Sequence, residues 1–326
     1  MSKIHRIHPY SHYFLFFILI YYVSLYKKRS DIKLAENDTY YKEFTAPLSR
    51  IFFGVITEPK SKRRSFVYNN WMHNILKSNY NSVKFISSKQ NDYTSLYIEP
   101  LKELYSHTIG VNKDVFRDRD RAIKRITGAK FFLDKTNFEY YWTLTDDTSI
   151  DIGVITKMIK ELDQKFNPFS DNVLKGHCLT SQKYTYLQGG SGYLMSRPVA
   201  KILVDHAEEW LEQITEDDDF FSNSIREWAG LTYQQTASHY FLGHIIKENF
   251  DGALKQRPYY KCNRTIDYFC GYDSFYPITD IGIIHISDLN YHRMFLKKIN
   301  AMKKNINSSI KYVFEFPIFI KFCREE

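Results

Sequence analysis

The chain has 326 residues, of which 44% are hydrophobic and 17% aromatic, so it can bury a large core and is neither disordered nor fibrous in composition. The formal net charge of +8 is compatible with nucleic acid, acidic lipid or an anionic substrate. Because the sequence has no zinc-finger spacing and no RNA-binding aromatic motif, we expect no nucleic-acid partner.

The N-terminal region has the pattern of a membrane anchor. Residues 13–26 are almost wholly apolar or aromatic, carry no charge, and are followed by Lys27, Lys28 and Arg29. No small-residue cleavage site is evident, which favours a signal anchor over a cleaved signal peptide. Basic residues stand on both flanks, with Lys3 and Arg6 before the segment, so the charges leave its orientation open. A lone anchor near the start fits a lumenal domain on a stalk, with a cytoplasmic tail at 1–12, a membrane helix at 13–26, a stem at 27–48 and a lumenal domain at 49–326.

Two further features suit a lumenal domain. Glycosylation sequons begin at Asn37, Asn263 and Asn307. The cysteines include no CxxC pair, which argues against zinc, and Cys262 and Cys270 flank a short loop. A disulfide between them would form in an oxidising compartment, and free buried thiols are the alternative.

Strand and helix patterns alternate through the rest of the chain. Apolar runs rich in strand formers predict strands at 50–57, 82–87 and 140–145. Apolar residues at helical spacing predict helices at 63–76, 112–133, 152–162 and 196–214. The run at 312–322 predicts one strand with a proline at its edge. This alternation indicates an α/β fold with a mostly parallel sheet.

Asp146 and Asp147 stand side by side at the end of the strand predicted at 140–145. Ligands of α/β proteins gather at the carboxyl ends of parallel strands, and adjacent carboxylates there suit Mg²⁺ or Mn²⁺. A turn, or a cap for the next helix, is the alternative interpretation of the pair.

A glycine-rich loop is predicted at Gly189, Gly190, Ser191 and Gly192, just before the helix at 196–214. Glycine lets the backbone approach a ligand closely, although a plain hairpin has the same composition. Because no Gly-Lys-Ser/Thr follows, the segment is not a phosphate-binding Walker loop.

An acidic run at 216–219 and several late histidines complete the set of candidates. A carboxylate of the run could take a proton from a hydroxyl group, whereas most acidic runs are solvated loops. His239 and His285 could each bind a metal or could be core histidines.

In order and spacing, these motifs resemble the fringe-like β1,3-glycosyltransferase family, which includes fringe proteins and core-1 galactosyltransferases. The resemblance covers roughly residues 50–295. The family's DDDT motif is similar to the "TDDT" that begins at Thr145, which implies that Asp147 binds the metal and that Asp146 faces the donor. The family's GGAGY motif followed by Ser-Arg is matched closely by "GGSGY" at 189–193 and then "SR" at 196–197.

The remaining site residues follow from the same resemblance. It implies that Asp218 is the catalytic base, with Asp217 and Asp219 as neighbouring alternatives. His285 is preferred to His239 as the metal-binding histidine. Arg63, eight residues before Trp71, matches an arginine on the nucleotide side of the family's site.

The resemblance implies a GT-A-type nucleotide-sugar fold in a single-pass type II protein of the Golgi or endoplasmic reticulum. The expected reaction is inverting, Mn²⁺- or Mg²⁺-dependent transfer of a hexose or N-acetylhexosamine from a UDP-sugar to a 3-hydroxyl of a glycan or glycoprotein. The alternative is an inactive relative that binds glycan or nucleotide sugar without turnover.

Overall fold

The computed structural model describes residues 48–59, 61–87, 96–180, 185–213, 220–242, 260–261, 274–305, 310–316 and 319–324. The chain divides into two compact units, Met1–Ala46 and Pro47–Glu326, and every described residue belongs to the second. The predicted tail and anchor, most of the stem, and the acidic run at 216–219 lie outside these residues. Within the described part, no helix combines the length and apolar character that crossing a membrane requires.

The strands of the central sheet are β1 (Ile51–Ile56), β2 (Val83–Ile86), β3 (Tyr97–Ile98), β4 (Tyr140–Thr145), β6 (Leu174–Thr180) and β7 (Thr185–Ser196). Those of a smaller sheet beside it are β5 (Thr148–Ile150), β8 (Phe241–Leu242) and β11 (Ile283–His285). Those of a third sheet are β9 (Tyr260–Lys261), β10 (Ser274–Pro277), β12 (Ile310–Phe316) and β13 (Phe319–Arg324).

The longer helices are α4 (Lys113–Lys135), α5 (Ile152–Asp163), α6 (Arg197–Asp205), α7 (Ala207–Gln213) and α12 (Leu289–Lys304). The short ones are α2 (Arg63–Val67), α3 (His73–Ser78), α9 (Arg226–Trp228) and α10 (Tyr233–Thr236). Further helical turns are η1 (Leu48–Arg50), η2 (Tyr68–Met72), η4 (Lys102–Thr108), η5 (Phe220–Ile225) and η6 (Ile278–Asp280).

The central sheet has the order β3-β2-β1-β4-β7-β6. The pairs β3–β2, β2–β1 and β1–β4 are parallel, whereas β7 is antiparallel to both β4 and β6. The predicted α/β fold with a mostly parallel sheet is therefore confirmed. The register pairs Ile56 with Thr145, so β1 and β4 end level and the residues after them share one edge of the sheet.

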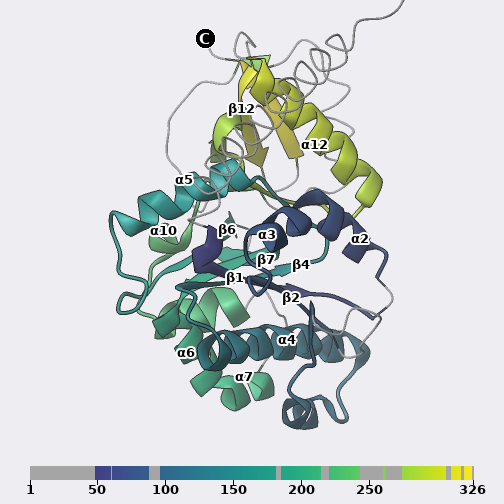
Figure 1. Cartoon of the computed structure of the whole chain (residues 1–326), viewed down its shortest axis with the longest axis vertical. Coiled ribbons are helices and arrows are strands. Elements are labelled where there is room, and N and C mark those ends of the chain that lie inside the picture. Colours follow the sequence, from purple (N-terminus) through teal and green to yellow (C-terminus); the bar gives the residue numbers. More distant parts are fainter. Residues whose placement is uncertain are drawn as a thin grey trace, which may run out of the picture. The chain divides into compact units, whose positions relative to one another are not determined.

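Helices cover both faces of the sheet (Figure 1). On one side lie α4, α6 and α7, and on the other α2, α3 and α5. Side chains alternate along each strand, so Tyr140, Trp142 and Leu144 belong to one core cluster while Tyr141 belongs to the other. A strand buried on both faces reads as a continuous apolar run, which explains the sequence pattern at 140–145.

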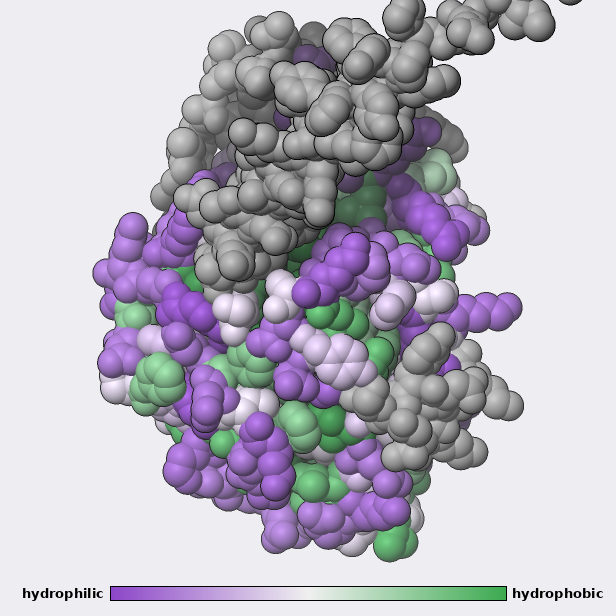
Figure 2. Space-filling model, viewed as in Figure 1, coloured by the Kyte–Doolittle hydropathy of each residue, from purple (hydrophilic) through white to green (hydrophobic). Residues whose placement is uncertain are grey.

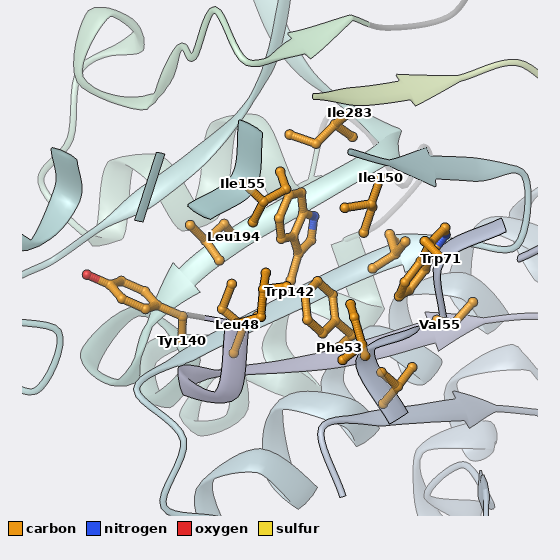
Figure 3. Packing of buried hydrophobic residues seen from close by; sticks show 14 of the residues in the cluster. Leu48, Phe53, Val55, Trp71, Tyr140, Trp142, Ile150, Ile155, Leu194 and Ile283 are labelled. Atoms are coloured by element: carbon orange, nitrogen blue, oxygen red, sulfur yellow. The ribbon is translucent and has the colours of Figure 1, made fainter. Parts of the chain in front are cut away.

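Trp142 and Phe53 lie at the centre of the cluster on the α5 side (Figure 3). Their rings stack with centroids 5.6 Å apart, and Trp71 packs on Phe53 at 5.5 Å. Ile283 of β11 joins the same cluster, so the smaller sheet and the central sheet share one core. This shared packing holds the strand that carries His285 against the end of β4.

Most predicted elements are confirmed, although three differ in detail. The helix predicted at 63–76 contains one turn of π-helix, η2, between α2 and α3. The helix predicted at 196–214 breaks at His206, which leaves helical geometry at ψ 17° and places its ring edge-on to that of Trp228, 3.7 Å away. The strand predicted at 312–322 is wrong: β12 and β13 form a hairpin in which Phe316 pairs with Phe319. Pro317, between them in the sequence, has no N–H to donate to a ladder, which is unfavourable inside one continuous strand.

The surface is mixed in character. Figure 2 shows hydrophilic residues over most of one face, with apolar residues in small separate groups among them. Cys178 of β6 is disulfide-bonded, so its partner is one of Cys262, Cys270 and Cys323. The predicted pair of Cys262 with Cys270 involves residues outside the described part of the chain.

Candidate active site

Asp146 and Asp147 form the link between β4 and β5, at the carboxyl edge of the sheet. Both are buried, with exposures of 6% and 3%. The register of β1 and β4 places Asp146 level with Thr57, whose hydroxyl donates a hydrogen bond to the Asp146 carboxylate. The pair is therefore neither a solvated turn nor the cap of α5, because Asp151 caps that helix.

Asp147 has a partner on each carboxylate oxygen. Nη1 of Arg63 lies 2.7 Å from its Oδ2, and Nε2 of His285 lies 3.1 Å from its Oδ1. The hydroxyl of Thr145 also lies within hydrogen-bonding distance of Oδ1. The structure thus brings together three residues that the sequence analysis proposed for the site, Asp147, Arg63 and His285, from three different parts of the chain.

The pKa values of the adjacent carboxyl groups of Asp146 and Asp147 are shifted in opposite directions. Burial raises the pKa of Asp146, and the hydrogen bonds from Ser61 and Thr57 offset only part of that rise. Burial also acts to raise the pKa of Asp147, but His285, Thr145 and Arg63 together hold that pKa well below its usual range. Asp147 is therefore the carboxylate that keeps its charge, and Asp146 is the one that takes up a proton more readily.

The glycine-rich segment is a bulge inside a strand, not the predicted loop between elements. Gly176 of β6 pairs with Tyr193, while the next residue, His177, pairs with Gln188. Residues 189–192 of β7 are therefore left out of the ladder with β6. Gly192 has φ +85°, a backbone conformation that residues with a side chain rarely adopt. A glycine at this position therefore allows the strand to form the bulge.

Gly190 is the point where this bulge meets the acidic site. A Cβ atom at this position would lie 2.2 to 2.6 Å from three atoms of the His285 ring, so the imidazole packs directly on the bare backbone. The Gly190 carbonyl lies 2.8 Å from the hydroxyl oxygens of both Thr145 and Thr148. Only glycine fits at position 190, because any side chain would displace the imidazole from Asp147.

The hydroxyl of Thr145 lies near two acceptors but carries a single hydrogen. It is within reach of both Asp147 Oδ1 and the carbonyl of Gly190. If Thr148 donates to Gly190, the hydrogen of Thr145 is left for the carboxylate, and both acceptors are satisfied. The bulge and the acidic link therefore form one hydrogen-bonded unit.

His285 is placed by strand pairing. It ends β11, where it pairs with Thr148 of β5 in the antiparallel register. Behind it, the buried imidazole of His292 lies 2.9 Å from the hydroxyl of Ser149 and packs on Phe66 with ring centroids 4.7 Å apart. Trp71 (Figure 3) donates from its indole nitrogen to the Thr148 carbonyl at 2.9 Å. These contacts fix the position of β5 and hence of the strand that carries His285.

His239 does not join this group. β8 and β11 are parallel and pair Phe241 with Ile283, and His239 precedes β8, whereas His285 ends β11. His239 lies instead beside Asp280, 3.8 Å from the carboxylate, and burial lowers its pKa. Of the two histidines considered from the sequence, the structure places His285 at Asp147.

Other proposed residues lie in or near the bulge or fall outside the described chain. Gly189 accepts a hydrogen bond from the buried Arg125, and Ser191 is fully buried with its hydroxyl 3.5 Å from the Gln188 carbonyl. The proposed catalytic acids Asp217, Asp218 and Asp219 are not among the described residues, so their role stays a prediction.

Sequence reasoning missed three contributors to the site. Thr57 holds Asp146, Thr145 lies between Asp147 and the bulge, and Arg125 reaches the bulge from α4. Thr57 is the last residue of the strand predicted at 50–57, so its place at the carboxyl edge was a usable signal. Arg125 carried none, since it is one of several arginines in the sequence of that helix.

The residues present fit a divalent cation with two protein ligands. Two ligands at right angles, each about 2.1 Å from an octahedral ion, are about 3.0 Å apart. Asp147 Oδ1 and His285 Nε2 are 3.1 Å apart, which is compatible with that spacing and is also the distance of a direct ion pair between the two side chains. Among the described residues there is no group of three or more His, Cys, Asp or Glu arranged to hold a metal. A cation here would depend on water and substrate oxygens for the rest of its coordination shell, as Mg²⁺ often does.

No protein-family model and no curated protein sequence matches this chain. Among solved structures, the chain is similar to the crystal structure of a glycosyltransferase involved in the glycosylation of the major capsid of PBCV-1. The two share 9% sequence identity, with a TM-score of 0.40 over 77% of this chain and 98% of that chain. A likeness of this degree assigns the chain neither a family nor an activity.

Proposed function

We propose that the protein is a metal-dependent glycosyltransferase that uses a nucleoside diphosphate sugar. One observation carries this proposal: Asp147, Arg63 and His285 converge at the carboxyl edge of the parallel strands. This edge is where α/β proteins bind nucleotides. A buried carboxylate with an imidazole for a cation, next to an arginine, is a donor set that suits a diphosphate.

Each of these residues has a distinct task in the proposed reaction. Arg63 is partly exposed, so its guanidinium can bind a phosphate oxygen while it still holds Asp147. Asp147 and His285 would hold the cation. When bound, the cation would neutralise the negative charge that develops on the leaving diphosphate. Asp146, buried beside Asp147 and hydrogen-bonded by Thr57, would face the donor.

The base that activates the acceptor hydroxyl is assigned to the acidic run, with Asp218 first and Asp217 and Asp219 as alternatives. An inverting transfer needs a carboxylate on the face opposite the leaving group, positioned to take the hydroxyl proton. This assignment, the UDP-sugar donor and the β1,3 linkage rest on the resemblance to the fringe-like family.

The cellular setting is proposed on similar grounds. The apolar segment at 13–26, the sequons and the disulfide at Cys178 are all typical of a lumenal domain tethered by one N-terminal helix. We therefore place the enzyme in the Golgi or endoplasmic reticulum membrane, with its catalytic domain in the lumen and a glycan or glycoprotein as acceptor.

A second candidate is an inactive relative that binds glycan or nucleotide sugar. One observation favours it: both carboxylate oxygens of Asp147 already have partners within the chain, Arg63 on one and His285 on the other. Arg63 and His285 together could balance the charge of Asp147 without a cation, which would leave a binding site that has no turnover.

The two candidates are separated by measuring UDP release by the full-length protein over a panel of UDP-sugars, with and without Mn²⁺. The test variant is Asp147→Asn, which keeps the shape of the side chain and removes its charge. Asp163→Asn is the matched control, because Asp163 is also an ion-paired aspartate but pairs with Arg50 at the amino end of β1. We expect Mn²⁺-dependent release with one donor, lowered about 100-fold by Asp147→Asn and unchanged by Asp163→Asn.

If no UDP release is detected, UDP binding is measured next, because hydrolysis of the donor without an acceptor is slow in many transferases. UDP that binds only with Mn²⁺ would keep the enzyme proposal and direct the search to acceptors. UDP that binds equally well without Mn²⁺ would move the conclusion to the inactive relative.

A further inference from the structure

Arg125 is a charged side chain buried beneath the glycine bulge. It lies on α4 and is only 1% exposed. Its Nη2 donates to the carbonyl of Gly189 at 3.0 Å, and its Nη1 donates to the hydroxyl of Thr143 at 3.2 Å. Its guanidinium also lies over the ring of Tyr193, 5.2 Å from the centroid. It therefore contacts residues at both ends of the bulge.

The burial of this guanidinium needs a reason, because removing a charge from water is costly unless hydrogen bonds and favourable electrostatics compensate. An apolar side chain would pack between α4 and the sheet at lower cost. What the arginine adds is a forked donor that can hold two groups at a fixed separation. Here those groups are β4, through Thr143, and the first residue of the bulge, through Gly189.

The next residue of the bulge carries this constraint to the site. Gly190 packs against the His285 ring without room for a Cβ, and its carbonyl oxygen lies 2.8 Å from the hydroxyl oxygens of Thr145 and Thr148. A shift of the bulge would therefore move the surface on which the imidazole rests. The 3.1 Å contact between His285 and Asp147 depends on that surface.

We propose that Arg125 is a positioning residue for the cation site: it fixes Gly189 and Gly190 so that His285 is held beside Asp147. This inference rests on the proposed function, because it assigns the pair of Asp147 and His285 to a cation. Arg125 itself touches neither substrate nor metal in this assignment. It acts through the backbone of the bulge, as the residues that orient metal ligands do in other proteins.

The test measures Mn²⁺ affinity by electron paramagnetic resonance on the full-length protein in the presence of UDP, together with the thermal unfolding midpoint. Arg125→Met keeps the length of the side chain and removes the forked donor. We expect Mn²⁺ affinity to fall about 10-fold in the folded protein. Arg125→Lys keeps a cation but cannot hold Thr143 and Gly189 with one planar group, so we expect an affinity between those of Arg125→Met and the wild type.

Arg197→Met is the matched control. Arg197 also donates to backbone carbonyls, those of Leu133, Thr136 and Phe138, and also lies over an aromatic ring, that of Phe132. These partners precede β4, at the end of the strand away from Asp147. A loss of packing alone would lower the unfolding midpoint in both methionine variants, whereas only Arg125→Met should weaken Mn²⁺ binding.

The outcomes are distinguishable. Unchanged Mn²⁺ affinity in folded Arg125→Met, with normal binding by the wild type, overturns the positioning role and leaves the proposed function standing. Absence of saturable Mn²⁺ binding by the wild type overturns both. If Arg125→Met does not fold, Arg125→Lys decides: weaker Mn²⁺ binding than wild type supports the role, and equal binding overturns it.

Discussion

The two ends of β1 and β4 both carry arginine–carboxylate pairs, and the pairs differ in character. At the amino end, Arg50 precedes β1 and pairs with Glu139 and Asp163, and all three side chains are between 22% and 30% exposed. At the carboxyl end, Arg63 pairs with Asp147, whose side chain is 5% exposed and lies next to a second buried carboxyl group.

This difference separates a structural ion pair from a candidate site. At the amino end, water screens the charges and the two carboxylates lie on separate elements. These ion pairs therefore form with little desolvation cost and little repulsion between the carboxylates. At the carboxyl end, adjacent buried acids are kept only because arginine, imidazole and hydroxyl groups from four segments converge on them. A cluster of buried charged groups with shifted pKa values is typical of functional sites.

The largest effect that would test this contrast is expected from Gly190→Ala. The added Cβ would lie 2.2 to 2.6 Å from the His285 ring and would push the imidazole away from Asp147. We expect about a 100-fold loss of Mn²⁺-dependent activity and a loss of about 1–3 kcal/mol in the free energy of unfolding. The measurements are UDP release and denaturant unfolding of the same samples.

Gly176→Ala is the matched control, since Gly176 lies opposite the end of the bulge on β6. A Cβ there would meet the nearest atom, on Tyr193, at 3.3 Å, which a small adjustment relieves. We expect near-normal activity for this variant. Equal loss in both variants would mean that the strand pair tolerates no methyl group anywhere, and the special role of Gly190 would then be rejected.

Much of the fold could be predicted from the sequence because burial on both faces leaves a plain signal. The apolar run at 140–145 and the spacing of Phe66, Trp71 and Ile75 each identified an element correctly. The π turn at Tyr68–Met72 and the break at His206 carried no such signal, because they arise from how helices meet their neighbours in three dimensions.

The site could be predicted only in part, because the positions of some of its residues depend on how strands pair and not on the local sequence. Asp147 follows a strand pattern directly, so its place at the edge of the sheet follows from the sequence. His239 and His285 both lie close to apolar runs, and it is the antiparallel pairing of β11 with β5 that brings His285 to Asp147. The bulge depends on the shift between Gly176 and His177 on the partner strand, which no local pattern in β7 reveals.

A smaller effect is expected from acid on protein stability, through His292 near the carboxyl ends of β1 and β4. Burial lowers the pKa of His292 to about 4, and nearby His285 adds to the lowering. The unfolded chain then binds more protons than the folded one between about pH 6.5 and 4, so stability falls as pH drops through that window. We expect the titration of His292 to lower the free energy of unfolding by about 2 kcal/mol between pH 7.5 and pH 5.

His292→Phe should remove that part of the pH dependence, because a phenyl ring can pack on Phe66 and does not titrate. Denaturant unfolding at pH 7.5 and pH 5 measures the change, and His73→Phe on the exposed surface of α3 is the control. If the fall in stability persists undiminished in His292→Phe, another group is responsible, and the carboxyl end is no more sensitive to acid than the rest.

The smallest effect is expected at the amino end, from Arg50→Met. The hydrogen bond from Arg50 to Glu139 raises the pKa of the arginine against the opposing effect of burial, yet all the charges involved reach solvent. We therefore expect a loss of about 1 kcal/mol or less in the free energy of unfolding, shrinking further in 0.5 M salt, where the screening length is about 4 Å. UDP release should be unchanged, because the glutamate and aspartate left behind remain hydrated and lie at the opposite ends of the strands from Asp147. A loss of activity comparable to that of Gly190→Ala would show that the two ends of the sheet are coupled, and the division into a structural end and a functional end would have to be abandoned.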